Sequence, residues 1–306
     1  MRAATYSEYS ADNSRLTVGE VFDPKVGPGQ VLIEVRAAGV NPVDWKVMAG
    51  GLDGMMDTVF PAIPGWDVAG VVRGAGPDTP EFTAGDEVMA YARKDAVQAG
   101  TFAQLVSVSA RDVARKPAAL DWSQAGGLPL AGLTALRSLD ALRIGSRDVL
   151  LVHAAAGGVG SMAVQIGRAR GARVIGTASQ RNHDYLRSLG AEPVAYGEGL
   201  VERVRALAPD GVTTVLDCVG GQLETTLAVL AEGGRHVSIA DPSVTGHGGR
   251  WIWVRPDGAG LAELGYLADR GLLKVEVAQT FPLSEVAAAF DLSRTGGVRG
   301  KLVIVP

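Results

Sequence analysis

The fold of this chain is decided by the stretch Val149-Leu150-Leu151-Val152-His153-Ala154-Ala155-Ala156-Gly157-Gly158-Val159-Gly160. The apolar run from Val149 to His153 predicts a short buried strand, and the helical spacing that follows predicts a helix from Val159 to Arg170. Between them lies a turn without large side chains. Its backbone can therefore approach a pyrophosphate, whose charge is stabilised by the N–H groups and the positive end of the next helix.

The spacing within this turn is a variant of the G-x-G-x-x-G fingerprint, with alanine in the first position. Its last glycine, Gly160, allows the helix to pack closely on the strand. A tight strand-to-helix turn without a ligand is the alternative interpretation, but the strand before it and the strand after the helix favour dinucleotide binding. The predicted cofactor-binding residues of the turn are Ala155, Gly157, Gly158, Val159 and Gly160.

Strands and helices alternate beyond this turn, which predicts an α/β domain of the Rossmann type with a doubly wound parallel sheet. The predicted elements are strands at 174–177, 212–218 and 235–239, and helices at 182–189 and 223–230, the second ended by Gly233-Gly234.

The first third of the chain has a different pattern, in which short apolar runs are separated by glycine and proline. These runs predict the strands of an antiparallel barrel or sandwich. The tail adds two helical segments and a terminal strand. The predicted strands are 31–36, 68–72, 87–92 and 102–108, and the tail elements are helices at 261–270 and 283–292 and a strand at 301–305.

Composition excludes several classes of protein. The chain has 306 residues, 47% of them hydrophobic, and its 41 glycines show no three-residue period, so it is neither collagen nor a low-complexity chain. Its one cysteine, Cys218, excludes a disulfide framework and any multi-cysteine zinc site, and favours a reducing, cytoplasmic location. The net charge of −4 without basic blocks argues against nucleic acid as a partner.

One stretch is long enough to span a membrane, because residues 149 to 167 lack Asp, Glu, Lys and Arg. It contains His153, Gln165 and the central glycines, so a buried strand, turn and helix explain it better. The N-terminal sequence leads into polar residues and does not resemble a signal peptide. We therefore expect no membrane association.

The segment after the second predicted strand favours NADPH. NAD-binding sites place Asp or Glu there, on the ribose 2′-hydroxyl, whereas this chain has Thr177-Ala178-Ser179-Gln180-Arg181-Asn182. Ser179 and Arg181 can hold a 2′-phosphate that a carboxylate would repel. Alternatively, Ser179 caps the next helix and Arg181 is solvated, and both roles are compatible.

Other catalytic constellations are not apparent. His153, at the end of its apolar strand, is interpreted as a structural histidine, and Cys218 as a small buried strand residue. The four histidines and one cysteine form no zinc pattern, and the Gly-x-Ser-x-Gly motif of serine hydrolases is absent.

Five segments together resemble the medium-chain dehydrogenase/reductase superfamily, specifically its zinc-independent quinone oxidoreductase branch. The segments are Gly39-Val40-Asn41-Pro42-Val43-Asp44-Trp45-Lys46, Pro61-Ala62-Ile63-Pro64-Gly65-Trp66-Asp67-Val68-Ala69-Gly70, Pro129-Leu130-Ala131-Gly132-Leu133-Thr134-Ala135, the turn 154–160 and Gly300-Lys301-Leu302-Val303-Ile304-Val305.

This resemblance covers nearly the whole chain. It implies a GroES-like catalytic domain made from 1–120 and 273–306, with a Rossmann NADP-binding domain inserted at 121–272. It also implies a homodimer.

Departures from the zinc alcohol dehydrogenases argue against a metal. Asn41-Pro42 stands where those enzymes have their catalytic cysteine, Gly65-Trp66-Asp67 stands where they have Gly-His-Glu, and their four-cysteine loop is missing. Without a Lewis acid, an alkoxide lacks its usual stabilisation.

The resemblance therefore implies hydride transfer from NADPH to a quinone or an α,β-unsaturated carbonyl. It places Asn41, Lys46 and Thr134 at the nicotinamide end, with Asn41 and Lys46 as the catalytic residues, and Tyr196 near the adenine-side phosphate. Lys46 would stabilise negative charge on the acceptor oxygen, or it is an ordinary surface lysine. Val219, Ser238 and Ile239 lie at the ends of later parallel strands, where such sheets bind ligands.

The substrate pocket implied by the resemblance includes Trp45, Trp66 and the segment 251–254, although ordinary packing also explains these aromatic residues. No general acid is evident, so water is expected to protonate the product. A different class of function stays open: a dinucleotide-binding module with little catalysis, structural, RNA-associating or redox-sensing.

Overall fold

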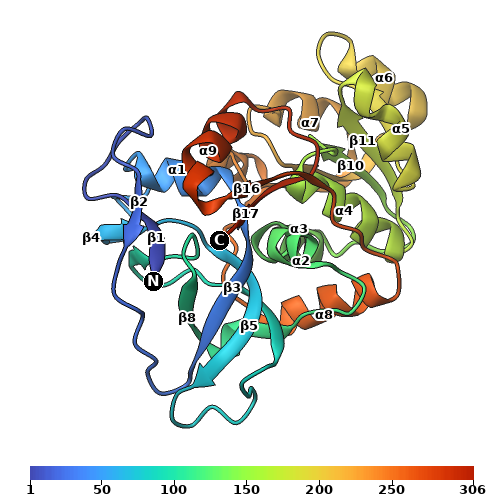
Figure 1. Cartoon of the computed structure of the whole chain (residues 1–306). Coiled ribbons are helices and arrows are strands. Elements are labelled where there is room, and N and C mark those ends of the chain that lie inside the picture. The colour runs from blue at the N-terminus through green and yellow to red at the C-terminus, as the bar shows by residue number, and fades with distance from the viewer. The chain divides into compact units, whose positions relative to one another are not determined.

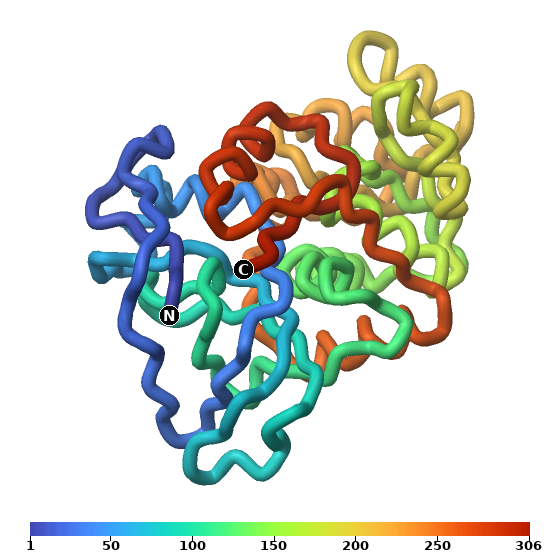
Figure 2. Tube along the Cα trace, viewed as in Figure 1, coloured from blue at the N-terminus to red at the C-terminus, as the bar shows by residue number.

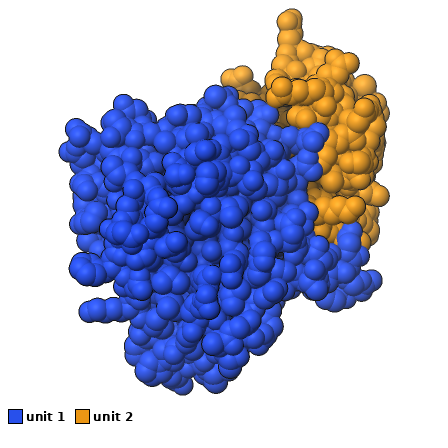
Figure 3. All heavy atoms as spheres, in the orientation of Figure 1, with its two compact units in different colours: residues 1–133, 255–271, 275–306 blue, residues 134–254, 272–274 orange.

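The structure is a computed structural model that describes all residues, Met1–Pro306. The chain forms two compact units (Figure 3): unit 1 comprises 1–133, 255–271 and 275–306, and unit 2 comprises 134–254 and 272–274. The chain crosses between the units after residues 133, 254, 271 and 274, whereas the family resemblance implied crossings after residues 120 and 272. Residues 255–271 join unit 1 because the helix they contain packs on the strands of that unit.

Unit 1 is built on a seven-stranded sheet in which β3 is the central strand. Its buried residues alternate at Val31, Ile33 and Val35, as expected of a strand with one face in the core. The strands of this sheet are β16 (Val277–Pro282), β17 (Lys301–Val305), β3 (Gln30–Val40), β5 (Asp67–Ala75), β6 (Glu87–Tyr91), β9 (Val113–Arg115) and β8 (Leu105–Ser109).

The predicted antiparallel pattern holds for most of this sheet, and β3 pairs antiparallel with β5, β8 and β17. The exception is the parallel pair β16–β17. Figures 1 and 2 show the last strand, in dark red, beside the blue β3, so the tail of the chain completes the sheet begun near its N-terminus.

Smaller elements surround this sheet in unit 1. They are the pairs β1 (Arg2–Thr5) with β2 (Thr17–Glu20) and β4 (Thr58–Ile63) with β7 (Val97–Ala99), the helices α1 (Pro42–Met48), α2 (Trp122–Gly127), α8 (Gly258–Asp269) and α9 (Val286–Thr295), and the 3₁₀ turns η1 (Ala110–Asp112) and η4 (Leu283–Glu285).

Unit 2 contains a six-stranded sheet that is parallel throughout, in the order β12-β11-β10-β13-β14-β15. This confirms the predicted doubly wound Rossmann sheet. Its strands are β12 (Glu192–Ala195), β11 (Arg173–Ala178), β10 (Val149–His153), β13 (Val212–Asp217), β14 (Leu230–Ser238) and β15 (Arg250–Trp251). Leu150, Leu151 and Val152 are all fully buried, because both faces of β10 are covered.

The helices of unit 2 connect these strands (Figure 1). They are α4 (Gly158–Ala169), α5 (His183–Ser188), α6 (Leu200–Leu207) and α7 (Leu223–Val229), with the 3₁₀ turns η2 (Gln180–Asn182) and η3 (Pro242–His247). The helix α3 (Pro129–Leu142) begins in unit 1 and ends in unit 2.

The prediction that Gly233-Gly234 end a helix was wrong. The helix α7 ends at Val229, and β14 begins at Leu230. Leu230 pairs with Val212, but the next pair is Arg235 with Thr214, so the glycines lie in an irregular stretch of the strand. Glycine marks such a bulge as readily as a helix end, and the sequence pattern alone does not distinguish the two.

None of the helices combines the length with the apolar character that crossing a bilayer requires. The charge-free stretch 149–167 is divided between β10 and α4, as the sequence predicted.

Candidate functional site

The turn between β10 and α4 is held by the neighbouring strand β11. The backbone N–H of Ala154 donates to Oγ1 of Thr177 at 3.1 Å, and the N–H of Ala155 donates to the carbonyl of Thr177 at 2.9 Å. Ala154 itself has a φ of 53°, which few residues other than glycine adopt. Thr177 therefore fixes the path of the turn, a role that its position in the predicted strand did not reveal.

Glycine is required at Gly160 by a close approach. A β-carbon there would lie 2.4 Å from the carbonyl oxygen of Ala154 and 2.7 Å from the α-carbon of Ala155. The first turn of α4 thus packs closely against the residues that directly follow β10. At Gly157 the nearest atom to such a β-carbon is 3.4 Å away, which is an ordinary contact.

The N-terminus of α4 carries no side-chain cap, because the N-cap residue is Gly157. The first N–H groups of a helix have no partner within the helix, and together with the helix dipole they attract an anion. These amides, and the small residues around them, fit the pyrophosphate of a dinucleotide.

The alanine at the first fingerprint position is accommodated by a glycine on β11. Ala155 is fully buried, and a β-carbon added to Gly176 would lie 2.8 Å from the β-carbon of Ala155. The missing side chain on β11 therefore provides the space that the methyl group of Ala155 occupies.

The ends of the central strands lie in one row, since His153 is in register with Asp217, and Asp217 with Ser238. Asp217 is buried, and one of its carboxylate oxygens accepts hydrogen bonds from the N–H groups of Val219 and Gly220, both at 2.9 Å. Its carbonyl accepts from the N–H of Ile239 at 3.0 Å. Asp217 therefore shapes the edge that carries the predicted cofactor residues Val219, Ser238 and Ile239.

Ser238 has a structural hydroxyl. It is fully buried, it donates to the second oxygen of Asp217 at 2.8 Å, and it accepts from the N–H groups of Ala240 and Asp241. Val219, in contrast, is 57% exposed beside it. The row of strand ends thus offers a ligand an apolar side chain and backbone groups rather than the serine hydroxyl.

Ser179, Arg181 and Tyr196 follow the ends of β11 and β12. Ser179 precedes η2 but its side chain makes no cap hydrogen bond, and its hydroxyl accepts instead from Nδ2 of Asn182 at 3.3 Å. Ser179 is thus the N-cap residue of η2, as the alternative interpretation expected, but its side chain supplies no cap hydrogen bond. Arg181 is exposed, and Tyr196 is 63% exposed.

His153 is buried at the end of β10, and its Nε2 has no hydrogen-bond partner. Burial lowers the pKa of this imidazole to about 4, and the neighbouring Asp217 offsets only part of that effect. His153 is therefore neutral at pH 7, as suits the predicted structural role more than that of a base. Cys218 lies just after β13 and is only partly buried, so it is not the buried strand residue that the sequence predicted.

Unit 1 contains a buried cluster of four polar side chains, which we call the acid–lysine cluster: Asn41, Asp44, Asp67 and Lys301. The ammonium of Lys301 donates to Oδ1 of Asn41 at 2.5 Å and to the carbonyl of Val40 at 3.0 Å. It also lies 3.7 Å from Oδ2 of Asp67. The amide Nδ2 of Asn41 donates to the same oxygen of Asp67 at 2.8 Å.

Both ends of the Asn41 side chain are therefore engaged within unit 1, and the residue is only 2% exposed. Its backbone N–H donates to Oδ2 of Asp44 at 2.7 Å, while Oδ1 of Asp44 has no partner. Asn41 and Asp67 occupy two of the positions at which the zinc alcohol dehydrogenases differ from this chain. The ammonium of Lys301, on β17, lies 2.5 Å from Oδ1 of Asn41 and 3.7 Å from Oδ2 of Asp67.

Burial disfavours the charged forms in this cluster. Desolvation raises the pKa of Asp44 to about 8 and that of Asp67 to about 6, although Lys301 lowers both. It also lowers the pKa of Lys301, against the attraction of the two carboxylates. Two carboxyl groups share one ammonium here, so the cluster binds a proton more readily than exposed aspartates do.

Lys46 and Trp45 lie on α1, directly after the cluster residue Asp44. Lys46 is exposed, and its ammonium lies 5.5 Å from the centre of the Trp45 ring. Trp45 is itself held by α9, because its Nε1 donates to the hydroxyl of Ser293 at 3.1 Å and the guanidinium of Arg294 lies over its ring.

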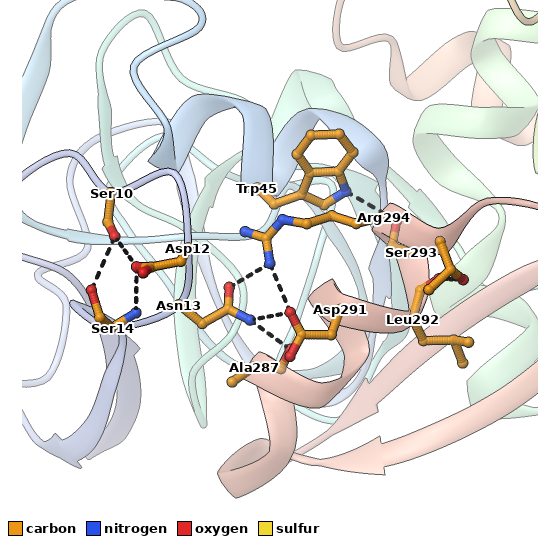
Figure 4. A network of polar contacts seen from close by, with 11 residues as sticks. Ser10, Asp12, Asn13, Ser14, Trp45, Ala287, Asp291, Leu292, Ser293 and Arg294 are labelled. Carbon is orange, nitrogen blue, oxygen red and sulfur yellow. Dashed lines mark hydrogen bonds and ion pairs between the residues drawn. The ribbon is translucent and has the colours of Figure 1, made fainter.

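Figure 4 shows that Arg294 also ties the N-terminal segment to α9. Its guanidinium donates to Oδ1 of Asn13 at 2.8 Å and to Asp291 at 3.0 Å. Asn13 donates in turn to Asp291 at 2.8 Å and to the carbonyl of Ala287 at 2.9 Å. This network fixes Trp45, and therefore the part of α1 from which Lys46 projects.

The predicted site residues are divided between the two units. Asn41 and Lys46 belong to unit 1, whereas Thr134 and the other predicted cofactor residues belong to unit 2. Within unit 2 the turn residues, Val219 and Ile239 lie along the carboxyl ends of the strands, and Thr134 lies buried in α3. No three His, Cys, Asp or Glu side chains of the chain form a group that could hold a metal ion.

The predicted pocket tryptophans differ in exposure. Trp66 is buried, with its ring centre 6.2 Å from that of Tyr91. Trp251 and Trp253 are 37% and 39% exposed and have ring centres 5.9 Å apart. Trp66 lies in unit 1 and the other two in unit 2.

Comparison with known proteins agrees with this architecture. Residues 27–118 match the model of the alcohol dehydrogenase GroES-like domain, and residues 189–304 match that of a family described as zinc-binding dehydrogenase. The whole chain is 35% identical to the NADPH-dependent alkenal/one oxidoreductase of Arabidopsis thaliana, of which it covers 80%. The chain belongs to the medium-chain dehydrogenase/reductase superfamily.

Within this superfamily the chain falls in the branch of quinone oxidoreductases and alkenal reductases. It is 33% identical over its full length to the 2-methylene-furan-3-one reductase of Solanum lycopersicum, of which it covers 79%. Its structure matches that of the quinone oxidoreductase from Coxiella burnetii with a TM-score of 0.88, at 32% identity and over 99% of that chain. This medium-chain dehydrogenase/reductase is therefore an NAD(P)H-dependent oxidoreductase, and the predicted family and fold are confirmed.

Proposed function

We propose that this oxidoreductase uses NADPH to reduce a quinone or an α,β-unsaturated carbonyl compound. The observation that carries the cofactor proposal is the end of β11, where Ser179 and Arg181 follow Ala178 and no carboxylate is present. The relatives named above support the acceptor class, since they include an alkenal/one oxidoreductase and a quinone oxidoreductase.

In the proposed reaction the bound nicotinamide supplies a hydride to the conjugated acceptor, and a proton from water completes the reduced product. The uncapped end of α4 binds the pyrophosphate, and Val219 and Ile239 line the path of the cofactor along the strand ends. Arg181 binds the 2′-phosphate through charge-assisted hydrogen bonds, with Ser179 beside it. Tyr196 is proposed for the adenine-side phosphate.

Lys46 is the residue of unit 1 best suited to stabilise negative charge on the acceptor oxygen, because its ammonium is exposed and its helix is held by Trp45. Asn41 is proposed as a positioning residue, since its side-chain amide is already bonded to Asp67 and Lys301. The reaction needs no metal, because Asn41 and Trp66 replace the cysteine and histidine of the zinc enzymes.

The decisive experiment is a panel of quinones, enones and enals, each tested with NADPH and with NADH. We expect NADPH oxidation with at least one acceptor of these classes, and weaker activity with NADH. Tight NADPH binding without turnover of any acceptor would instead support the alternative of a dinucleotide-binding module. Sedimentation of the same preparation tests the homodimer that the family resemblance implies.

A further inference from the structure

Two adjacent cations in unit 1 have no acidic partner. Arg93 and Lys94 lie in the segment that joins β6 to β7, and both are only partly exposed. No carboxylate lies within ion-pair distance of either group. The Nε of Arg93 is buried without a hydrogen-bond partner, and its Nη1 donates to the sulfur of Met56 at 3.8 Å, which is a weak acceptor.

Lys94 is the more unusual of the two. Burial alone lowers the pKa of this ammonium, and no charged or hydrogen-bonding neighbour acts to raise it. Lysine is seldom buried unless it is paired. The neighbouring residue Asp95 is exposed, and the carboxyl group of Asp112 senses the charge of Arg93 without forming an ion pair with it.

Other cations of unit 1 that are comparably buried do have partners. The ammonium of Lys116 lies 3.3 Å from Glu87 and donates to the carbonyl of Leu120 at 2.9 Å, while Lys301 lies in the acid–lysine cluster. Arg294 is paired with Asp291. The segment with Arg93 and Lys94 therefore carries positive charge that the protein itself leaves uncompensated.

This segment is joined directly to Trp66, the residue that replaces the zinc-ligand histidine of the related enzymes. The N–H of Ala92 donates to the carbonyl of Trp66 at 2.6 Å, and the ring of Tyr91 packs beside that of Trp66. Burial raises the pKa of the Tyr91 hydroxyl, and the charge of Arg93 offsets part of this effect, so the guanidinium lies close to this hydroxyl group. The two cations thus border the part of unit 1 where the acceptor is expected.

We infer that Arg93 and Lys94 bind an anionic group of the acceptor, so that the physiological acceptor is a conjugated carbonyl compound that carries a carboxylate. Consecutive residues here supply a guanidinium and an ammonium, each of which can donate charge-assisted hydrogen bonds to a carboxylate, and their partial burial strengthens such interactions. The inference rests on the proposed reductase function and narrows its substrate class.

The test compares 4-carboxycinnamaldehyde with its methyl ester, which has the same conjugated aldehyde but no charge. For the wild-type enzyme we expect a KM at least about 10-fold lower for the acid than for the ester, with similar kcat, because a charge-assisted hydrogen bond contributes that much to affinity. Lys94→Gln and Arg93→Ala should remove the preference by raising the KM of the acid alone. Arg93→Lys should retain part of it.

Lys25→Gln, which changes an exposed lysine of the same unit, serves as the control and should leave the preference unchanged. Equal KM values for acid and ester in the wild type, or a preference that survives in both Lys94→Gln and Arg93→Ala, would overturn the inference. Calorimetric binding of the two compounds to the NADPH complex provides a readout without turnover. If neither compound is reduced but the acid still binds more tightly, the reductase proposal fails for this acceptor and the anion site stands.

Discussion

Lys301 and Asn41 are 260 residues apart in the chain, yet the lysine ammonium donates to the asparagine amide oxygen at 2.5 Å in the interior of unit 1. The contact exists because β17 pairs with the end of β3, which places Leu302 opposite Val40. The lysine thereby compensates part of the charge of Asp67, and it holds Asn41 in one orientation.

Replacing Lys301 by methionine should destabilise the protein strongly at pH 8. The substitution leaves two buried carboxyl groups without a cation, and breaking a buried pair in this way costs about 3–5 kcal/mol. Urea unfolding measures the loss. Lys25→Met, at an exposed position, should change the unfolding free energy by less than about 0.5 kcal/mol. Equal stability of the two variants would contradict the role given to Lys301.

The contribution of Asp44 and Asp67 to the stability of the protein should decline as the pH rises from about 4 to about 8, whereas His153, whose pKa burial lowers to about 4, contributes in the opposite direction up to about pH 6.5. The pKa values of Asp67 and Asp44 are raised in the folded protein to about 6 and about 8, so the native state binds more protons than the unfolded state across this range. The part of the unfolding free energy that these two carboxyl groups contribute then falls with rising pH.

Asp44→Asn removes one of these groups but keeps an oxygen that can accept from the N–H of Asn41. Between pH 6 and pH 8, the decrease in the unfolding free energy should be smaller for this variant than for the wild type, by roughly 1–3 kcal/mol. Asp210→Asn, an exposed control, should follow the wild-type curve. Parallel curves for wild type and Asp44→Asn would show that Asp44 does not titrate in this window.

Gly160→Ala should weaken NADPH binding by more than about 10-fold. Its β-carbon would lie 2.4 Å from the carbonyl oxygen of Ala154, so the turn or the helix must move, and the amides that face the pyrophosphate move with it. Fluorescence titration of NADPH measures the effect. Gly157→Ala introduces the same methyl group where the nearest atom is 3.4 Å away, and it should bind within about threefold of the wild type.

Arg181→Ala should weaken NADPH binding by about 10-fold and NADH binding by less than about twofold, because only NADPH carries the 2′-phosphate. Arg187→Ala is the matched control, since this exposed arginine pairs with Asp184 at 2.6 Å on the following helix. Equal losses for the two cofactors in Arg181→Ala would exclude a 2′-phosphate contact.

Arg294→Ala should loosen the N-terminal segment. The variant loses the hydrogen bonds to Asn13 and Asp291 and the stacking on Trp45, which together should cost about 1–3 kcal/mol. Hydrogen exchange should then accelerate in residues 10–16. Arg15→Ala, which removes only an exposed ion pair with Glu8, should leave exchange in the segments around Trp45 unchanged.

The turn between β10 and α4 could be predicted because the residues that shape it are close together in the sequence. Strand β10 was predicted at its observed bounds, and Gly160 proved to need the absence of a side chain. The function of Thr177 could not be predicted, because its hydroxyl reaches the turn across two parallel strands. Its only sequence signal was a hydroxyl near the end of the predicted strand.

The acid–lysine cluster lay beyond sequence reasoning for a similar reason. Asn41 and Asp67 were singled out as departures from a zinc site, but the partner that joins them comes from the terminal strand. Lys301 lies in an apolar strand at the end of the chain, and the sequence around it does not indicate which side chains it contacts. Register between distant strands decides such contacts, and it depends on the whole sheet.

The pairing of β17 with β3 also has a consequence for how the protein is made. Asn41, Asp44 and Asp67 leave the ribosome early, whereas Lys301 is synthesised only after every residue of unit 2. A nascent chain can therefore fold unit 2 while the acidic residues of unit 1 still await their counter-ion, since domains generally fold as units during synthesis. Unit 1 can therefore be completed only late in synthesis, and translation that stops before residue 301 should yield a chain in which unit 2 is folded and unit 1 is not.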